Sequence, residues 1–168
     1  HQAFRDDPSL VWLTGRCLIV DGAGQPIRRA ISGYKNALLR RYSFGLHLTH
    51  NFVAAPSTFF RRDAFLEAGG MDLDLRYSMD YDLYLRLGRA HRPRVLAQDL
   101  AAFTMADGTL SMTGFERQFV EHYEVARRYA QDRRWAALTN RAFSSGIVFT
   151  YRAMARRSPR DRGGGPVE

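Results

Sequence analysis

The segment from residue 56 to residue 87 constrains the fold of this chain more than any other. Thr58, Phe59 and Phe60 form a short apolar run that predicts a strand. Asp63 follows as a good helix N-cap, because its side chain can accept hydrogen bonds from the free amides of the next turn. Gly69 and Gly70 end that helix, since glycine adopts the left-handed conformation at little cost. A strand, a short helix and a loop are therefore expected in close succession.

Four aspartates in two Asp-X-Asp pairs follow this helix: Asp72, Asp74, Asp80 and Asp82. In an extended segment, residues two apart point the same way, so Asp72 and Asp74 can share a cation. The apolar residues after Asp80 recur at helical spacing, which places Asp80 and Asp82 in the first turn of a helix, where their side chains diverge. The helix dipole alone also favours acidic residues there. Spacing therefore leaves a metal site and a plain helix start as alternatives.

The sequence STFFRRDAFLEAGGMD, followed by MDYDLYLRL, resembles the acceptor-side half of the bacterial family 2 glycosyltransferases, which are inverting enzymes. The resemblance covers roughly residues 8 to 113 and is densest between residues 51 and 88. It implies that Asp80 is the catalytic general base. It also implies acceptor-binding or supporting roles for five further residues, which are Ser57, Thr58, Arg61, Asp82 and Arg86.

The fold implied by this resemblance is α/β, a partial GT-A (Rossmann-like, nucleotide-diphospho-sugar transferase) fold with additional C-terminal helices. Residues 1–113 would be the acceptor-side half, residues 114–157 the helices and residues 158–168 a disordered tail. The chain opens at His1 without a methionine, so we expect a piece whose nucleotide-binding half lies upstream. Such a piece would be inactive alone.

The reaction implied by the resemblance is transfer of a sugar, with inversion, from a nucleotide-sugar donor to a hydroxyl of a glycan or lipid-linked acceptor. A divalent cation, Mg²⁺ or Mn²⁺, would be bound mainly by the upstream half, with Asp72 and Asp74 as weak candidates here. A helix N-terminus is expected to keep Asp80 ionised. The chain departs from the family's sequence pattern at three positions. Ala55 stands where glutamine is frequent, and Thr104 and Ala106 replace an arginine and a histidine.

Residues elsewhere predict a strand over 11–20 and a turn over 21–24, followed by a polar surface helix and loop over 28–50. His47 and His50 lie in that polar segment, where solvent-facing or hydrogen-bonded histidines are expected rather than metal ligands. A further strand is predicted over 51–55, and a short one over 95–97 that leads to Phe103. The single Cys17 lies in an apolar strand and has no partner for an internal disulfide.

The basic charge is concentrated near the C-terminus, where residues 133–160 hold seven arginines and no acidic residue. Aromatic residues are not interleaved with these charges and no nucleic-acid motif is present, so no nucleic acid is expected as a partner. Of the 25 basic residues only Lys35 is a lysine. An arginine excess of this size reflects codon bias more than phosphate recognition.

Two helices are predicted after residue 113, the first with capping-box spacing between Thr113 and Glu116 and with His122 on its apolar face. The second, over 136–157, carries Phe143, Ile147, Tyr151 and Met154 on one side. This apolar stripe either packs on the domain or docks on an anionic membrane surface. We expect a cytoplasmic protein, with peripheral association to the inner face of the membrane as the second reading.

Two other function classes remain open at this point. A non-enzymatic basic module would use the 133–160 arginines to bind a membrane or nucleic acid. A metal-dependent hydrolase would combine Asp72 and Asp74 with Asp80, but no histidine stands at ligand spacing.

Overall fold

The protein is a mixed α/β structure with a small mixed sheet, described by a computed structural model over residues 2–105, 115–131 and 133–157. The described sheet has three strands in the order β2-β1-β3. The central strand β1 (Trp12–Val20) pairs antiparallel with β2 (Thr58–Phe60) and parallel with β3 (Arg94–Thr104). The strands predicted over 11–20, at 58–60 and from residue 95 are confirmed.

The turn after β1 is also confirmed. Val20 forms an isolated bridge with Pro26, and the amide of Ile27 donates to the carbonyl of Ile19 over 2.8 Å. The Asp21 carboxylate stabilises this turn, because it accepts from the amides of Ala23 and Gln25.

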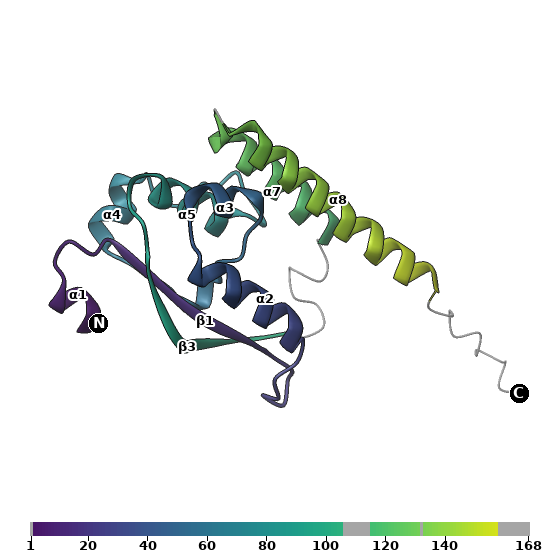
Figure 1. The fold of residues 1–168 in the computed structure, drawn as a ribbon, viewed down its shortest axis with the longest axis horizontal. Coiled ribbons are helices and arrows are strands. Elements are labelled where there is room, and N and C mark those ends of the chain that lie inside the picture. Colours follow the sequence, from purple (N-terminus) through teal and green to yellow (C-terminus); the bar gives the residue numbers. More distant parts are fainter. Residues whose placement is uncertain (1, 106–114, 132, 158–168) are drawn as a thin grey trace, which may run out of the picture.

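The described helices are α1 (Gln2–Asp6), α2 (Arg29–Arg40), α3 (Phe44–Thr49), a single 3₁₀ turn (Ala55–Ser57), α4 (Arg62–Glu67), α5 (Met79–Ala90), α7 (Phe115–Ala130) and α8 (Arg134–Arg157). In the view of Figure 1, most of the described helices lie on one side of strands β1 and β3, and α7 and α8 lie furthest from them. Helix α2 lies along β1, whereas α7 and α8 pack on each other beside α3 and α5. The predicted helices before and after the acidic loop are confirmed.

Helix α5 is the centre of the core, because its side chains enter two apolar clusters. One is formed by Trp12, Leu39, Tyr42, Phe52, Val53, Leu83, Tyr84 and Leu87. The other is formed by Leu48, Leu75, Tyr81, Leu85, Val125, Ala126 and Ala136. A Cβ atom at Gly88 would collide with the Tyr42 hydroxyl, so this close approach requires glycine. The position of α5, and of Asp80 in its first turn, is therefore fixed from two sides.

The start of α4 differs from the prediction. Arg61 occupies the cap position, with no side-chain hydrogen bond there, and Asp63 lies inside the first turn. The Asp63 carboxylate accepts only from the neighbouring amide of Ala64. The predicted helix end is confirmed, since Gly69 and Gly70 have φ of 87° and 71°.

Two predictions for the middle of the chain are wrong. Residues 51–55 do not form a strand, and residues 44–49 form a buried helix instead of a surface segment. His47 is fully buried because it packs against the aromatic rings of Tyr42, Phe52 and Tyr81. Histidine can be buried in this way when it stays neutral, which a reading of its polarity alone misses.

Helix α8 is packed on the domain along much of its described length. Ala136, Ala137, Asn140 and Ser144 are buried. The Asn140 amide donates to the carbonyl of Leu48 over 3.0 Å and so satisfies the C-terminal end of α3. The side chains of Tyr151 and Met154, and residue 113 of the predicted capping box, lie outside the described part of the structure.

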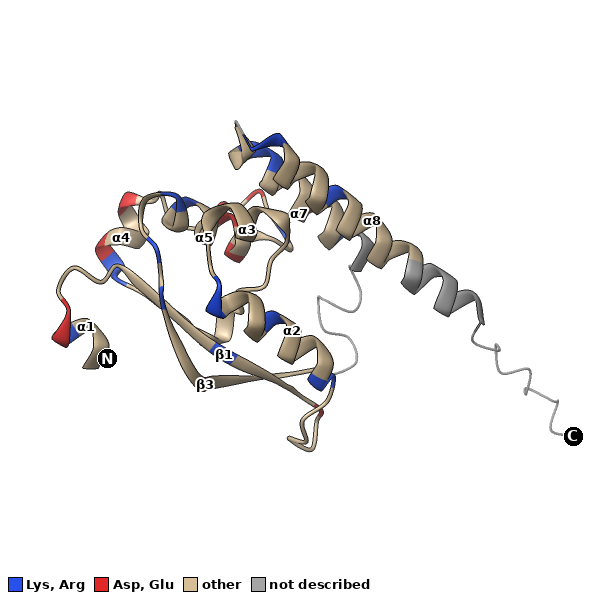
Figure 2. Cartoon of the chain, in the orientation of Figure 1, with Lys and Arg blue, Asp and Glu red and all other residues tan. Residues whose placement is uncertain are grey.

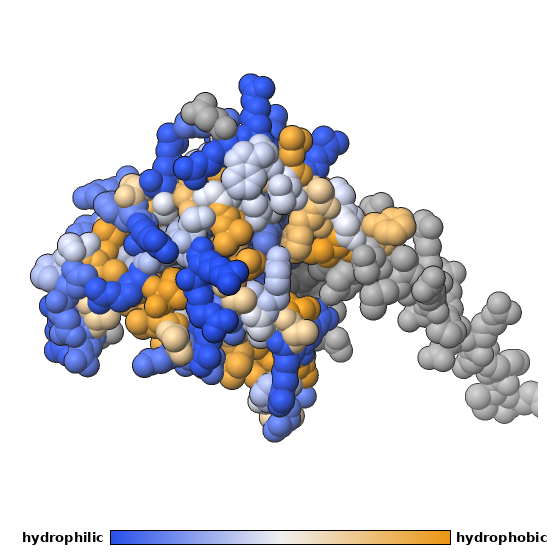
Figure 3. Space-filling view, in the orientation of Figure 1, coloured by the Kyte–Doolittle hydropathy of each residue, from blue (hydrophilic) through white to orange (hydrophobic). Residues whose placement is uncertain are grey.

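Charged residues are spread over several elements (Figure 2). Basic segments lie on α2 and at the start of α8, and acidic ones on α1 and α4. On the face in Figure 3, apolar patches lie between charged side chains. None of the helices in the described residues is long and apolar enough to cross a membrane.

Candidate active site around Asp80

Asp80 lies in the first turn of α5, and its carboxylate is shielded from water by the surrounding chain. Burial raises the pKa of this carboxyl above its usual value. Hydrogen bonds from the Tyr81 amide (2.7 Å) and from the Asn51 side chain, together with the charge of Lys35, act in the opposite direction. Burial is the larger effect on the pKa of Asp80, and it opposes the helix start; that Asp80 stays ionised remains a prediction.

Lys35, the only lysine of the chain, reaches this site from α2. Burial lowers the pKa of Lys35, and the charge of Asp80 raises it in part. The sequence analysis missed this residue as a site component. One lysine among 24 arginines was the available signal, because a lysine head group is compact and can give up its proton when buried, which arginine does not.

A cavity of about 530 Å³ opens next to this pair, between α2, the segment after α3, α7 and α8. Its wall includes Lys35 and Asn51, the two side chains that interact with Asp80. The remaining lining residues are Arg28, Ala30, Ile31, Tyr34, His50, Gln118, Phe119, His122, Asn140, Phe143, Ser144 and Ile147. Phe143 and Ile147, two residues of the predicted apolar stripe, therefore line this cavity.

The histidines of the cavity wall are neutral near pH 7. Burial lowers the pKa of His50 to about 4 and that of His122 to about 3. His50 lies between the rings of Tyr34 and Phe143, at centroid distances of 5.6 and 4.4 Å, and forms an aromatic wall with them. The prediction that His122 is a buried core histidine is confirmed.

One buried polar atom of the cavity residues, His122 Nε2, has no hydrogen-bond partner within the described chain. Leaving such an atom unpaired costs about 1–3 kcal/mol. A bound molecule or water with matching polar groups would remove that cost.

Asp82 is structural in its contacts, although it stands only two residues from Asp80. Its carboxylate is 1% exposed and accepts from Arg86 at 2.7 Å and from the Tyr129 hydroxyl at 2.7 Å. Arg86 also donates to the carbonyls of Ala68 and Gly70 after α4. The two residues therefore join α4, α5 and α7.

Glu121 of α7 holds the segment that leads into α5. Its Oε1 accepts from the amides of Arg76, Tyr77 and Ser78 over 2.9, 3.1 and 3.2 Å. The two partners lie 45 residues apart in the sequence, so no local sequence pattern predicts this contact. Glu121 is a positioning residue, because it fixes the backbone directly before Asp80.

The other predicted site residues lie along β1 and β2. Ser57 is buried and donates to the carbonyl of Gly15, and Thr58 donates to Thr14 Oγ1. Arg61 donates to the carbonyls of Leu10, Phe4 and Asp7. These contacts join the N-terminal segment to the sheet.

The two aspartates of the acidic loop contact other groups of the chain. Asp72 pairs with Arg128 at 2.9 Å and accepts from the Asp74 amide at 3.1 Å. Both contacts lower the pKa of Asp72, that of Arg128 most. No three histidine, cysteine or acidic side chains converge as ligands in the described ranges. The weak role of Asp72 and Asp74 in binding a cation stays a prediction.

The chain matches no model of a known protein family, and no curated protein is significantly similar to it. The function is therefore argued from the site and from the sequence resemblance.

Proposed function

We propose that the chain is the acceptor side of an inverting glycosyltransferase of the family 2 type, with Asp80 as general base. The observation that carries the proposal is the contrast between Asp80 and Asp82. Asp82 is held by arginine and tyrosine, whereas Asp80 has no arginine partner within the described chain and lies beside a cavity. A partial GT-A fold is part of this proposal, and the parallel β1–β3 pair and the antiparallel β2 are compatible with it.

The chemistry needs a base within hydrogen-bond reach of the attacking hydroxyl. The hydroxyl oxygen forms a bond to the anomeric carbon as the bond from that carbon to the diphosphate oxygen breaks, and the hydroxyl proton goes to the Asp80 carboxylate. The diphosphate leaves with the electron pair. Attack opposite to the leaving group inverts the anomeric carbon. A raised pKa makes Asp80 a stronger base once it is ionised.

The proposal assigns the nucleotide-sugar donor and its Mg²⁺ or Mn²⁺ to a nucleotide-binding half outside these residues. The cation would stabilise the departing diphosphate. Within the described chain, Asn51 and Lys35 favour the charged form of the Asp80 carboxylate against the larger effect of burial, and Glu121 fixes the backbone before it.

The test compares Asp80→Asn with Asp99→Asn in an enzyme that contains both halves. Asp99 forms an exposed pair with Arg16 on the sheet and serves as the matched control. Loss of the base should lower kcat by about two orders of magnitude or more with little change in donor affinity. Turnover of Asp80→Asn equal to that of Asp99→Asn would remove Asp80 from the role.

A second function is favoured by the outer surface of α8, where Trp135, Leu138 and Phe149 are 58%, 62% and 74% exposed. Arginines 133, 134 and 141 lie on the same part of the chain. Exposed apolar side chains beside arginines fit an anionic membrane surface. We propose that this surface associates with the cytoplasmic side of a membrane. Membrane association would accompany the enzymatic role, or would be the function of the chain if it has no enzymatic role.

A further inference from the structure

Lys35, the only lysine of the chain, lines the cavity next to Asp80 and is half-buried there. Its amine forms no ion pair or hydrogen bond with the residues that the structure describes, and Asp80 acts on it only through its charge. Among the described residues, the cavity wall holds a second basic residue, Arg28, and no acidic one. The amine therefore lines the cavity without a carboxylate in the wall that would hold it in the charged form.

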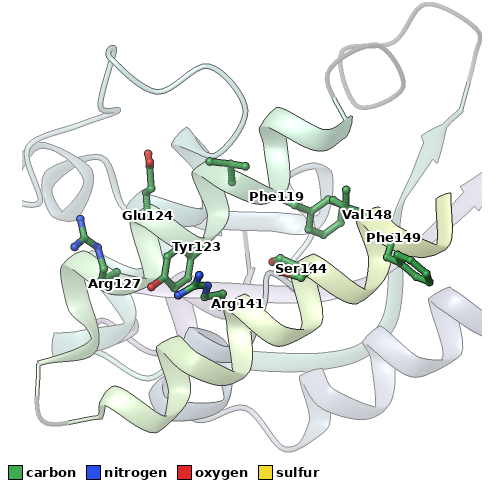
Figure 4. Close-up of a pocket in the computed structure, with 10 residues that line it drawn as sticks. Phe119, Tyr123, Glu124, Arg127, Arg141, Ser144, Val148 and Phe149 are labelled. Carbon is green, nitrogen blue, oxygen red and sulfur yellow. The ribbon is translucent and has the colours of Figure 1, made fainter. Parts of the chain in front are cut away.

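A groove between α7 and α8, of about 650 Å³, offers no comparable group (Figure 4). Its charged lining residues are Glu124, Arg127 and Arg141. The guanidinium of Arg141 covers the ring of Tyr123 at 5.8 Å. Arginine keeps its proton in proteins and so cannot act as a nucleophile. The amine of Lys35 is thus specific to the cavity beside α2.

The chemistry of Lys35 depends on whether its amine carries a proton, because only the unprotonated amine is a nucleophile. Burial lowers the pKa of Lys35, and the charge of Asp80 offsets this effect only in part. A larger share of this amine is therefore unprotonated near pH 7 than of an exposed lysine. An unprotonated lysine in a cavity is the arrangement that proteins use to bond to carbonyl compounds.

The cavity has the size and the lining for a small apolar molecule. Its volume of about 530 Å³ lies within the range of about 300–1,000 Å³ that is typical of small-molecule sites. Tyr34, His50 and Phe143 supply aromatic rings to its wall. Burial lowers the pKa of His50 to about 4 and of His122 to about 3, so both are uncharged near pH 7. The two basic residues of the wall disfavour a cationic ligand.

We propose that Lys35 forms a Schiff base with a small apolar aldehyde or ketone that binds in this cavity. The amine nitrogen forms a bond to the carbonyl carbon, and the electrons of the C=O π bond move to the oxygen. The carbinolamine then loses this oxygen as water, which carries away both protons of the amine, and the C=N bond forms. The step needs no oxidant, reductant or further co-reactant. It does not rest on the proposed sugar transfer, which uses Asp80 as the base.

Reductive trapping with benzaldehyde and sodium cyanoborohydride tests the proposal on the chain itself. Peptide mass mapping separates Lys35 from the N-terminal amine, the one other primary amine of the chain. The control combines Lys35→Arg with Arg40→Lys, which moves the lysine to the exposed end of the same helix. At pH 7, Lys35 should be labelled at least about tenfold faster than the relocated lysine. The difference should shrink toward about pH 10, where an exposed lysine also loses its proton.

A second pair of variants tests the role of the cavity. Ile147→Trp fills part of it and should slow the labelling of Lys35 several-fold, whereas Leu138→Trp adds the same side chain to α8 outside the cavity wall and should not. Melting temperatures show that each variant is folded. Equal labelling rates of Lys35 and the relocated lysine at pH 7 would overturn the proposal, as would equal rates in the two tryptophan variants. No nucleotide-sugar is present, so either result leaves the Asp80 proposal untouched.

Discussion

Asp80 and Asp82 stand on the same helical turn, yet the Asp82 carboxylate is paired with Arg86 at 2.7 Å while burial raises the pKa of Asp80. The charge of the Asp82 carboxylate is balanced by Arg86. The charge of the Asp80 carboxylate is disfavoured by burial, and its contacts do not fully offset that effect. Uncompensated ionisable groups next to a cavity are typical of functional sites, because a structural group would be paired or replaced.

The first prediction concerns Asp82. Asp82→Asn should destabilise the domain by about 3–5 kcal/mol, because it leaves Arg86 partly buried without its carboxylate partner. Asp72→Asn breaks an ion pair of similar length, with Arg128, but on the surface, where solvent screens the pair, and should cost much less. Chemical denaturation of both variants provides the comparison, and equal losses would contradict the structural role of Asp82.

The local sequence predicts much of this region and misses its long-range partners. The glycines that end α4, the turn after β1 and the first turn of α5 follow from backbone chemistry and spacing within a few residues. Lys35 and Glu121 reach the site from α2 and α7, and no pattern along the chain records that approach. The burial of His47 depends on rings from three separate segments, which also escapes a reading of local polarity.

The second prediction concerns Lys35. Lys35→Met should raise the pKa of Asp80 further, because the charge of Lys35 lowers it in the native protein. Arg40→Met removes an exposed charge from the end of the same helix and should leave that pKa in place. A carbon-13 NMR titration of the aspartate carboxyls follows both variants. An unchanged Asp80 titration in Lys35→Met would show that the two groups are not coupled.

The third prediction concerns Glu121. Glu121→Gln removes the charge that accepts three amides, and should cost about 1–3 kcal/mol of unfolding free energy. The amides of Tyr77 and Ser78 should then exchange faster with solvent, since their acceptor is weakened. Glu124→Gln, one turn away on the exposed side of α7, is the control. Equal exchange rates in the two variants would contradict the positioning role.

The fourth prediction is a loss of stability in mild acid. Burial lowers the pKa of His47 to about 3, of His122 to about 3 and of His50 to about 4, whereas unfolded histidines titrate near about 6.5. Between these values the unfolded chain binds more protons than the native one. Stability is therefore fully present above about pH 6.5 and should fall by up to about 1.4 kcal/mol per pH unit for each histidine below it. Denaturation midpoints from pH 7.5 to pH 4.5 measure the slope, and His122→Gln should reduce it by about one proton.

The last prediction separates the packed face of α8 from its outer face. Asn140 is fully buried and bonds to Leu48, so Asn140→Ala should lower the melting temperature, whereas the exposed neighbour change Thr139→Ala should not. The outer residues Trp135, Leu138 and Phe149 are exposed, so their joint replacement by serine should leave the melting temperature nearly unchanged. If this face docks on anionic membranes, the triple variant should stop sedimenting with phosphatidylserine vesicles, and added salt should weaken the binding of the original chain. Vesicle binding that survives the triple replacement would place the contact elsewhere and defeat the membrane proposal.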